Sequence, residues 1–303
     1  MARILVSGLV NIETVLQIDG FPIEYFPVRF PFFGVHSTIS GVGFNIAKAL
    51  TTLGEDVYLC SIIGNDIHQT QIYEALLDAR INPEWVIDGS NSTPQSVILF
   101  DPNGKRQIHV DLKDIQQKQY PQKKFEEALA LASLAVLCNI NFSRGYLAKT
   151  KLAGIPIATD VHSISCLEDE YNYDFMAAAD ILFCSDELLP CEPEEWADKV
   201  LSRFRANVVV IGLGDKGAYL AVRDRAIREK LDPVYTRPVV NSIGAGDALF
   251  SCFLHYYLAT KDASLSLRKA MVFASYKIGE RGAAEGFLPE RDLEIIYAKN
   301  YLA

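Results

Sequence analysis

The sequence has no run of Lys or Arg longer than a pair, and its formal net charge is −9. Nucleic acids and anionic membranes are bound by clustered positive charge, so this composition argues against both kinds of partner. No stretch approaches the ~20 apolar residues of a membrane-spanning helix, and the apolar run Arg3–Ser7 is too short for a signal-peptide core. We therefore expect a cytoplasmic protein that binds phosphate only at a local site.

Paired cysteines and clustered histidines are also lacking. The six cysteines have no C-x-x-C spacing, and several lie in apolar runs such as Val57–Cys60. The five histidines show no spacing typical of a transition-metal site. We expect reduced thiols in a core.

What the sequence does contain is an alternation of short apolar runs and amphipathic segments. Continuous apolar strands between helices indicate an α/β fold with a mainly parallel central sheet and helices on both faces. The expected strands are Arg3–Ser7, Asp56–Ile63, Leu134–Asn139, Pro156–Asp160, Ile181–Cys184 and Val208–Gly212. The expected helices include Asn45–Leu53, Gln71–Ala79, Phe125–Ala132, Pro193–Phe204 and Asp247–Thr260.

Two segments, at about 13–38 and 92–113, interrupt this alternation. The first is rich in Phe, Pro and Tyr, which favours extended strands and turns over helix. The second has alternating strands, Ser96–Phe100 and Gln107–Leu112, around the turn sequence Asp101–Gly104. Together they predict a small antiparallel β-sheet that serves as a lid on one domain spanning residues 1–303.

The strongest local signal is the run Val239–Phe250, a strand-like stretch followed by Gly244-Ala245-Gly246 and then Asp247. Small residues let backbone N–H groups converge, and the start of a helix attracts anions. Asp247 stands where a carboxylate could take a proton from an attacking hydroxyl. The alternative is an ordinary N-capped turn without chemistry.

A second glycine turn leads into a helix at Ile39–Leu50, with Asn45 in the first turn. This arrangement suits a ligand hydroxyl close to the backbone. An ordinary glycine loop with a capping Asn would give the same pattern.

A third run contains Gly212, Gly214 and Gly217 in G-x-G-x-x-G spacing after a strand. A dinucleotide site would need a helix to open there. Instead Ala218–Val222 is typical of a strand, and Arg223–Arg225 of a turn, so we reject that reading and expect a loop that touches nucleotide phosphates.

Further candidates are less specific. Asp160 and His162 end a buried strand, where ligand sites gather; we expect Asp160 to line the cleft or simply to end the strand, and His162 to cap a loop. The aromatics of the first segment could stack on a nucleobase, bury each other, or pack against a partner lid in a dimer, and we favour lid or dimer packing; these are Tyr25, Phe26, Phe30, Phe32 and Phe33.

These three glycine-bearing runs, in this order, resemble the signatures of the ribokinase-like (PfkB-type) carbohydrate kinase family. Asn241–Asp247 is similar to D-T-x-G-A-G-D, Ser40–Ala47 to G-G-x-x-x-N-x-A, and Val209–Gly217 to V-x-x-G-x-x-G. The resemblance implies a ribokinase-like fold, ATP and Mg²⁺ as cofactors, and phosphorylation of a hydroxymethyl group on a small sugar. From the lid aromatics we also expect a homodimer formed through the lid.

The resemblance also assigns roles residue by residue. It implies that Asp247 is the catalytic base and that Gly244, Ala245 and Gly246 form the anion hole. The implied substrate residues are Asn11, Glu13, Gly41, Asn45 and Arg106, to which the strand-end argument adds Asp160. The implied nucleotide residues are Gly212, Gly214, Gly217, Gly282 and Ala283, and Glu187 is the implied metal residue.

Some positions depart from the family pattern. Ser40 replaces a glycine, Glu13 replaces an aspartate, and Asn241-Ser242 replaces Asp-Thr, which weakens any inference of a monovalent-cation site. The stretch Ile181–Leu188 lacks the family's Asn. A nucleoside kinase and a non-catalytic sugar-binding relative therefore stay open; phosphorylated sugars rank lower, because only Arg29, Lys105 and Arg106 could bind their phosphate.

Overall fold

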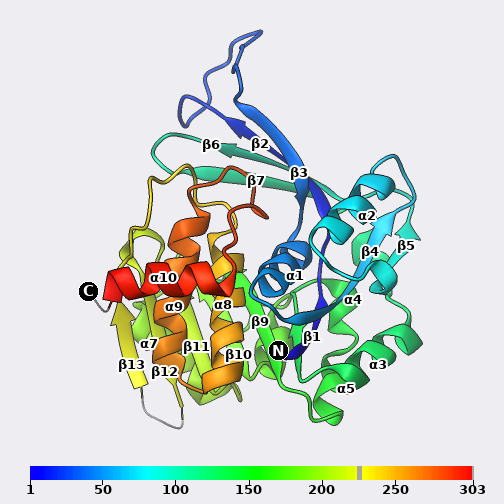
Figure 1. Ribbon diagram of the computed structural model, residues 1–303, viewed down its shortest axis with the longest axis vertical. Coiled ribbons are helices and arrows are strands. Elements are labelled where there is room, and N and C mark those ends of the chain that lie inside the picture. Colours follow the sequence, from blue (N-terminus) through cyan, green and yellow to red (C-terminus); the bar gives the residue numbers. More distant parts are fainter. Residues whose placement is uncertain (224–226, 302–303) are drawn as a thin grey trace.

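The molecule is built on a nine-stranded sheet with a second, four-stranded sheet above it (Figure 1). The structure, a computed structural model, describes residues 1–223 and 227–301. In spatial order the large sheet consists of β13 (Ile227–Leu231), β12 (Ala218–Val222), β11 (Val208–Gly212), β10 (Ile181–Ser185), β9 (Ile157–Ser163), β8 (Leu134–Leu137), β1 (Arg3–Ser7), β4 (Asp56–Gly64) and β5 (Val86–Ser90). Neighbouring strands are parallel except at β11–β12 and β12–β13. The predicted mainly parallel sheet is confirmed.

The helices cover both faces of this sheet because successive strand residues point to opposite sides. Val208 and Val210 of β11 belong to one buried cluster, whereas Val209 and Ile211 belong to the other. The first cluster takes residues from α1 (Val42–Thr52), α2 (Gln69–Asp78), α8 (Ala245–Thr260), α9 (Ala263–Lys277) and α10 (Glu290–Tyr301). The second takes residues from α3 (Gln122–Leu131), α4 (Asn141–Arg144), α5 (Leu147–Leu152), α6 (Tyr173–Ala178) and α7 (Pro193–Arg203).

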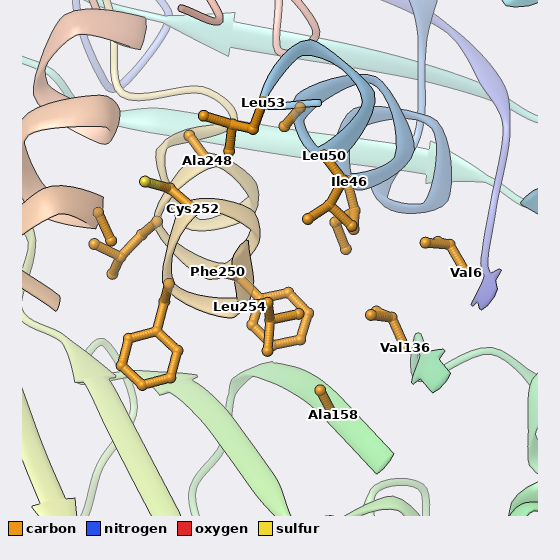
Figure 2. Close-up of a cluster of buried hydrophobic side chains, with 14 of the residues drawn as sticks. Val6, Ile46, Leu50, Leu53, Val136, Ala158, Ala248, Phe250, Cys252 and Leu254 are labelled. Carbon is orange, nitrogen blue, oxygen red and sulfur yellow. The ribbon is translucent and has the colours of Figure 1, made fainter. Parts of the chain in front are cut away.

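Helices α1 and α8 pack side by side in the first cluster. Figure 2 shows Ile46 and Leu50 of α1 and Phe250 and Leu254 of α8 above Val136 of β8. All five side chains are nearly or fully buried. This packing fixes the two helices that carry Asn45 and Asp247 relative to each other.

The four-stranded sheet, called the lid sheet here, has the order β3 (Val35–Ser40), β2 (Asn11–Gln17), β6 (Gln95–Phe100) and β7 (Arg106–Asp111). Its strands come from the two segments that were expected to leave the α/β alternation. One pair, β2–β6, is parallel, so the sheet is not wholly antiparallel as predicted. Figure 1 shows residues 18–34, between β2 and β3, projecting away from the body. Below the lid sheet, Val15, Ile98 and Phe100 pack on Ile243 and Ala283.

Several expectations can be checked directly. All six cysteines are free thiols, and Cys60, Cys138, Cys184 and Cys252 are buried, as expected. The turn predicted at Arg223–Arg225 lies largely outside the described residues. Among residues 1–223 and 227–301, every helix is too short or too polar to cross a bilayer.

Candidate active site

The N-terminus of α8 is formed by a tight turn, Ser242–Gly246, called the anion turn here. Gly244 has φ 73°, and a side chain on it would lie 2.5 Å from the Ala283 carbonyl oxygen, so only glycine fits. Its carbonyl accepts the Ala248 N–H at 3.1 Å. The N–H groups of Gly246 and Asp247 therefore precede the first intrahelical donor, Ala248, and lie at the positive end of the helix dipole.

The strand predicted just before the anion turn is wrong. Val239 and Val240 are partly exposed and belong to no strand. Instead the Val240 N–H donates to the Ile278 carbonyl at 2.9 Å, which ties this segment to the end of α9. A β-branched pair favours extended backbone, but here the partner is a helix C-terminus rather than a neighbouring strand.

Asp247 lies at the start of α8 with only 9% of its surface exposed. Its Oδ2 accepts a hydrogen bond from Asn45 Nδ2 at 2.7 Å, across 202 residues of chain. Burial raises the pKa of Asp247 to about 6, reinforced by Asp160 and Glu13 and opposed by the Asn45 bond and by His162. The structure thus brings together the two glycine-turn helices that sequence analysis singled out.

A hydrogen-bonded chain continues from Asn45 into the lid sheet. Ser40 Oγ donates to Asn45 Oδ1 at 3.1 Å and to Glu13 Oε2 at 3.0 Å, the two bonds sharing one hydroxyl. Glu13 Oε1 accepts the Ala283 N–H at 3.0 Å. Burial raises the pKa of Glu13. The departures at positions 13 and 40 therefore fit each other, because the longer acid reaches both Ser40 and the backbone of Ala283.

Asn11 lies beside Glu13 on the same face of β2. Its Nδ2 donates to Ser96 Oγ at 3.1 Å, whereas its Oδ1 is buried without a partner. A buried acceptor left unpaired costs free energy, so it marks a place where a ligand donor fits. Gly41 closes this corner: its φ is 103° and a side chain would lie 2.5 Å from the Leu9 carbonyl oxygen.

Asp160 also lies near the anion turn. Its Oδ2 lies 3.9 Å from where a side chain on Gly246 would begin, and its Oδ1 accepts the His162 N–H at 2.8 Å. His162 has φ 57° at the end of β9. The carboxylate is therefore held by a local turn at the edge of the site.

The Gly212–Gly217 loop contains a single 3-10 turn, Gly214–Lys216, and joins β11 to the antiparallel strand β12, so no α-helix opens there and the rejection of a dinucleotide site stands. The Gly212 carbonyl accepts the Asp186 N–H at 3.0 Å. This places the loop beside Glu187, at the carboxyl ends of β10 and β11. The predicted phosphate contacts of Gly214 and Gly217 stay a prediction.

Arg106, at the start of β7, connects the lid sheet to the body. It donates to Ser242 Oγ at 2.8 Å and to Glu187 Oε1 at 3.1 Å, while Ser163 Oγ donates to Glu187 Oε2 at 3.2 Å. Arg106 and Glu187 line a surface hollow of about 510 Å³. The other lining residues are Phe21, Gly104, Lys105 and Gln107. One side chain thus spans the lid, the anion turn and the predicted metal residue.

Gly282 and Ala283 lie on the lid side of the anion turn. Ala283 contacts Glu13 and Gly244, and the Gly282 N–H donates to Glu285 Oε2 at 2.8 Å. Glu285 in turn pairs with His36 of β3 at 2.9 Å. These contacts are with the lid sheet, and a role of the two residues in nucleotide binding stays a prediction.

Within the described residues, no group of three or more His, Cys, Asp or Glu side chains could hold a metal ion. Mg²⁺ commonly binds through phosphates, waters and only one or two carboxylates. A single nearby carboxylate, Glu187, fits an ion of that kind and does not fit a metal held by protein alone.

Sequence analysis missed Lys277 and Ser242. Lys277 ends α9, where a lysine normally points into water, yet it is fully buried and donates to the Ile243 carbonyl. No local pattern signals this, because the partner lies 34 residues away. Ser242 is a departure from the family motif, and its contact with Arg106 depends on where the lid lies.

The fold and the anion turn define a phosphotransferase of the ribokinase type, and comparison with known proteins supports this class. The family model described as pfkB family carbohydrate kinase matches residues 1–291. The chain belongs to that family and is an ATP-dependent carbohydrate kinase, a phosphotransferase with an alcohol group as acceptor.

The chain is similar to several characterised relatives over most of its length. A deoxyribokinase from Salmonella typhi is 28% identical over 299 residues, covering 94% of this chain and 95% of that protein. Acarbose 7(IV)-phosphotransferase from Actinoplanes sp. is 24% identical over 275 residues, covering 90% and 91%. A microbiome-derived acarbose kinase superposes with a TM-score of 0.86 at 24% identity over 98% and 99% of the two chains, which supports the fold.

Proposed function

We propose that this kinase transfers the γ-phosphoryl group of ATP to a hydroxymethyl group of a small sugar, with Asp247 as the catalytic base. The observation that carries the proposal is a buried carboxylate fixed at the N-terminus of α8, directly after the anion turn. A base must accept a proton while its neighbours stabilise charge on the transferring group. The carboxylate and the charge-stabilising N–H groups lie within one turn of helix.

In this mechanism Asn45 holds one oxygen of Asp247, which leaves Oδ1 for the hydroxyl proton. The N–H groups of Gly244 and Gly246 stabilise negative charge that spreads over the transferring phosphoryl oxygens, joined by that of Ala245 when it leaves the Ser242 carbonyl, to which it donates at 3.2 Å. Arg106, when the lid is closed, adds positive charge beside the same turn. Since Asp247 is nearly excluded from water, proton transfer occurs in a low-dielectric environment.

The acceptor pocket is proposed to lie under the lid sheet. The unpaired Oδ1 of Asn11 accepts a sugar hydroxyl, and the remaining lone pairs of Glu13 accept others. Gly41 lets the ligand approach the backbone, and Asp160 lines the edge of the cleft. We rank a nucleoside below a sugar, although a nucleoside kinase from Burkholderia thailandensis shares the fold with a TM-score of 0.81 at 16% identity, over 100% of this chain and 99% of that one.

The nucleotide is proposed to extend from the anion turn along the Gly212–Gly217 loop, with Gly282 and Ala283 at its border. When bound, Mg²⁺ neutralises the phosphate charge and orients the β- and γ-phosphates. Glu187 would be the residue that holds the ion. Arg106 and Lys105 make the hollow beside Glu187 suitable for an anionic group.

We also propose that the chain is one cytoplasmic domain and that the lid sheet closes over the acceptor. Two copies pair through their lids, which covers the aromatic side chains of residues 18–34. Their exposure supports this: Tyr25, Phe32 and Phe33 are 91, 85 and 88% exposed. Large exposed apolar patches mark interaction surfaces in soluble proteins.

The test is an ATP-consumption assay with Mg²⁺ across pentoses, hexoses and nucleosides. It compares the wild type with Asp247→Asn and with a matched control, Asp198→Asn, which removes an exposed carboxylate on α7. We expect one sugar to drive ADP release that Asp247→Asn abolishes and Asp198→Asn preserves. A nucleoside as the best acceptor would overturn the sugar assignment. Ligand-induced thermal shifts without turnover would favour a binding protein.

A further inference from the structure

Lys277 is the one residue among the largest fully buried side chains that carries a charge, and none of the roles above uses it. It is the last residue of α9 and its side chain has no exposed surface. A buried ammonium is costly unless its partners compensate for lost water. Its position therefore needs a reason beyond packing.

The partner of Lys277 is the carbonyl oxygen of Ile243, the residue directly before Gly244. The same peptide segment is held from its other side, because Asn241 Oδ1 accepts the Ile243 N–H at 2.9 Å. Asn241 Nδ2 in turn donates to the Arg281 carbonyl at 2.9 Å. Both polar groups of Ile243 are thus anchored to the end of α9 and the segment after it.

The peptide group between Ile243 and Gly244 consists of the Ile243 carbonyl and the Gly244 N–H. Peptide groups are planar and almost always trans, so these two bonds point in opposite directions. When the carbonyl points to the buried ammonium, the Gly244 N–H must point the other way. A charge-assisted hydrogen bond also polarises the peptide and makes that N–H a better donor.

We propose that Lys277 is a positioning residue for phosphoryl transfer, an internal cation that holds the Ile243 carbonyl and so keeps the Gly244 N–H directed toward the transferring group. This inference rests on the proposed function of the anion turn. Asn241 is neutral and Arg106 contacts only the side chain of Ser242, so among the described residues the lysine is the one full positive charge that hydrogen bonds to the backbone of this segment. Turnover should therefore need no dissolved monovalent cation.

The acidic surroundings explain how the ammonium is tolerated. Burial lowers the pKa of Lys277 to about 8, and nearby Glu13, Asp247, Glu285 and Glu280 act in the opposite direction. These acids lie on β2, on α8 and in the segment after α9. A cation in this place balances negative charge on both sides of the anion turn.

The first experiment compares Lys277→Met with Lys269→Met. Lys269 lies on the same helix, has a side chain only 11% exposed, and pairs with Glu294 away from the site. For Lys277→Met we expect kcat to fall about 10- to 100-fold, somewhat less than the loss of a direct anion-hole donor, and KM for the sugar to change less than about threefold. Lys269→Met should leave both constants unchanged. Equal kcat in the two variants would overturn the proposal.

A second experiment uses chemical rescue to distinguish loss of the Lys277 charge from general destabilisation of the fold. Lys277→Ala opens a cavity beside the Ile243 carbonyl, and K⁺ or ethylammonium should restore about tenfold of the lost kcat, whereas bulky tetramethylammonium should not. The wild type should respond to none of them. Failure of every small cation to restore turnover, with the variant folded, would contradict the role of the charge.

Hydrogen exchange tests the role of Lys277 even if the proposed function is wrong. If the wild type phosphorylates nothing, the proposed function fails, but the amides of the anion turn can still be followed. Lys277→Met should speed exchange at Gly244–Gly246 about tenfold relative to Lys269→Met. Unchanged exchange would show that Lys277 does not position the turn.

Discussion

At the scale of single residues, the raised pKa of Asp247 sets the acid limit of activity. The carboxylate must be ionised to accept the hydroxyl proton, and its pKa is about 6. Burial is the main cause; Asp160 and Glu13 add to it, while Asn45 and His162 oppose it. We expect kcat/KM to fall about tenfold for each pH unit below about 6. A profile that stays flat down to pH 5 would contradict the assignment of the base.

The alkaline limit should come from Lys277. Its pKa is about 8, lowered by burial, and it faces Glu13, Asp247, Glu285 and Glu280. Loss of the ammonium proton above this pH leaves a neutral amine and weakens the charge-assisted hydrogen bond to the Ile243 carbonyl, so kcat should decline there in the wild type. The decline should be absent in Lys277→Met, whose residual activity no longer depends on that proton.

The ionised side chain of Asp247 should also lower the free energy of unfolding of the protein. A carboxyl whose folded pKa is raised is most favourable when protonated, so its contribution is fully present below about pH 4 and is lost as the pH rises through about 6. Asp247→Asn keeps a neutral side chain at every pH. We expect its free energy of unfolding to exceed that of the wild type by about 1–3 kcal/mol at pH 7.5 and to equal it near pH 3.5. Urea unfolding at the two pH values measures this, and a destabilised variant at pH 7.5 would refute it.

At the scale of elements, Arg106 joins β7 of the lid sheet to Ser242 and to Glu187. We expect Arg106→Ala to lower kcat/KM about 10- to 100-fold, because it removes a charge-assisted contact at the anion turn. Exposed ion pairs contribute little stability by themselves, so the melting temperature should hardly change.

A double-mutant cycle separates the two partners of Arg106. If Arg106 and Glu187 act only through each other, Glu187→Ala and the double variant should lose no more activity than Arg106→Ala. If Glu187 also binds the metal, its loss should add a further increase in the Mg²⁺ concentration needed for half-maximal rate. Kinetics over a Mg²⁺ titration distinguish these outcomes.

The sequence predicted most elements because their signals are local. Strands β1 and β11 were placed at their observed ends, since apolar runs between turn residues are read directly. The run at Val239 was placed wrongly, because its β-branched residues satisfy a helix end instead of a strand. Asp247 and Asn45 were found as candidates from two motifs, yet their mutual hydrogen bond depends on the packing of α1 against α8. The role of Lys277 could not be predicted, because burial of a lysine is decided by residues distant in the sequence.

At the scale of the whole molecule, the projecting segment between β2 and β3 exposes several large apolar side chains. Phe32 and Phe33 are 85 and 88% exposed. If two lids pair there, Phe32→Ser with Phe33→Ser should shift the molecule from dimer to monomer in analytical ultracentrifugation. The matched change Leu152→Ser, at a residue 88% exposed on α5, should leave the mass unchanged. A wild type that sediments as a monomer at micromolar concentration would refute lid pairing.

The bond between Asn45 and Asp247 spans 202 positions, and the bond between Glu13 and Ala283 spans 270. The part of the site that holds Asp247 and Glu13 is therefore assembled from the first fifty residues and from the last quarter of the chain. During translation, the early residues emerge long before their partners exist, and no partial product can hold a complete site. We therefore expect kinase activity only in products whose synthesis has passed residue 283, so that premature termination yields inactive fragments.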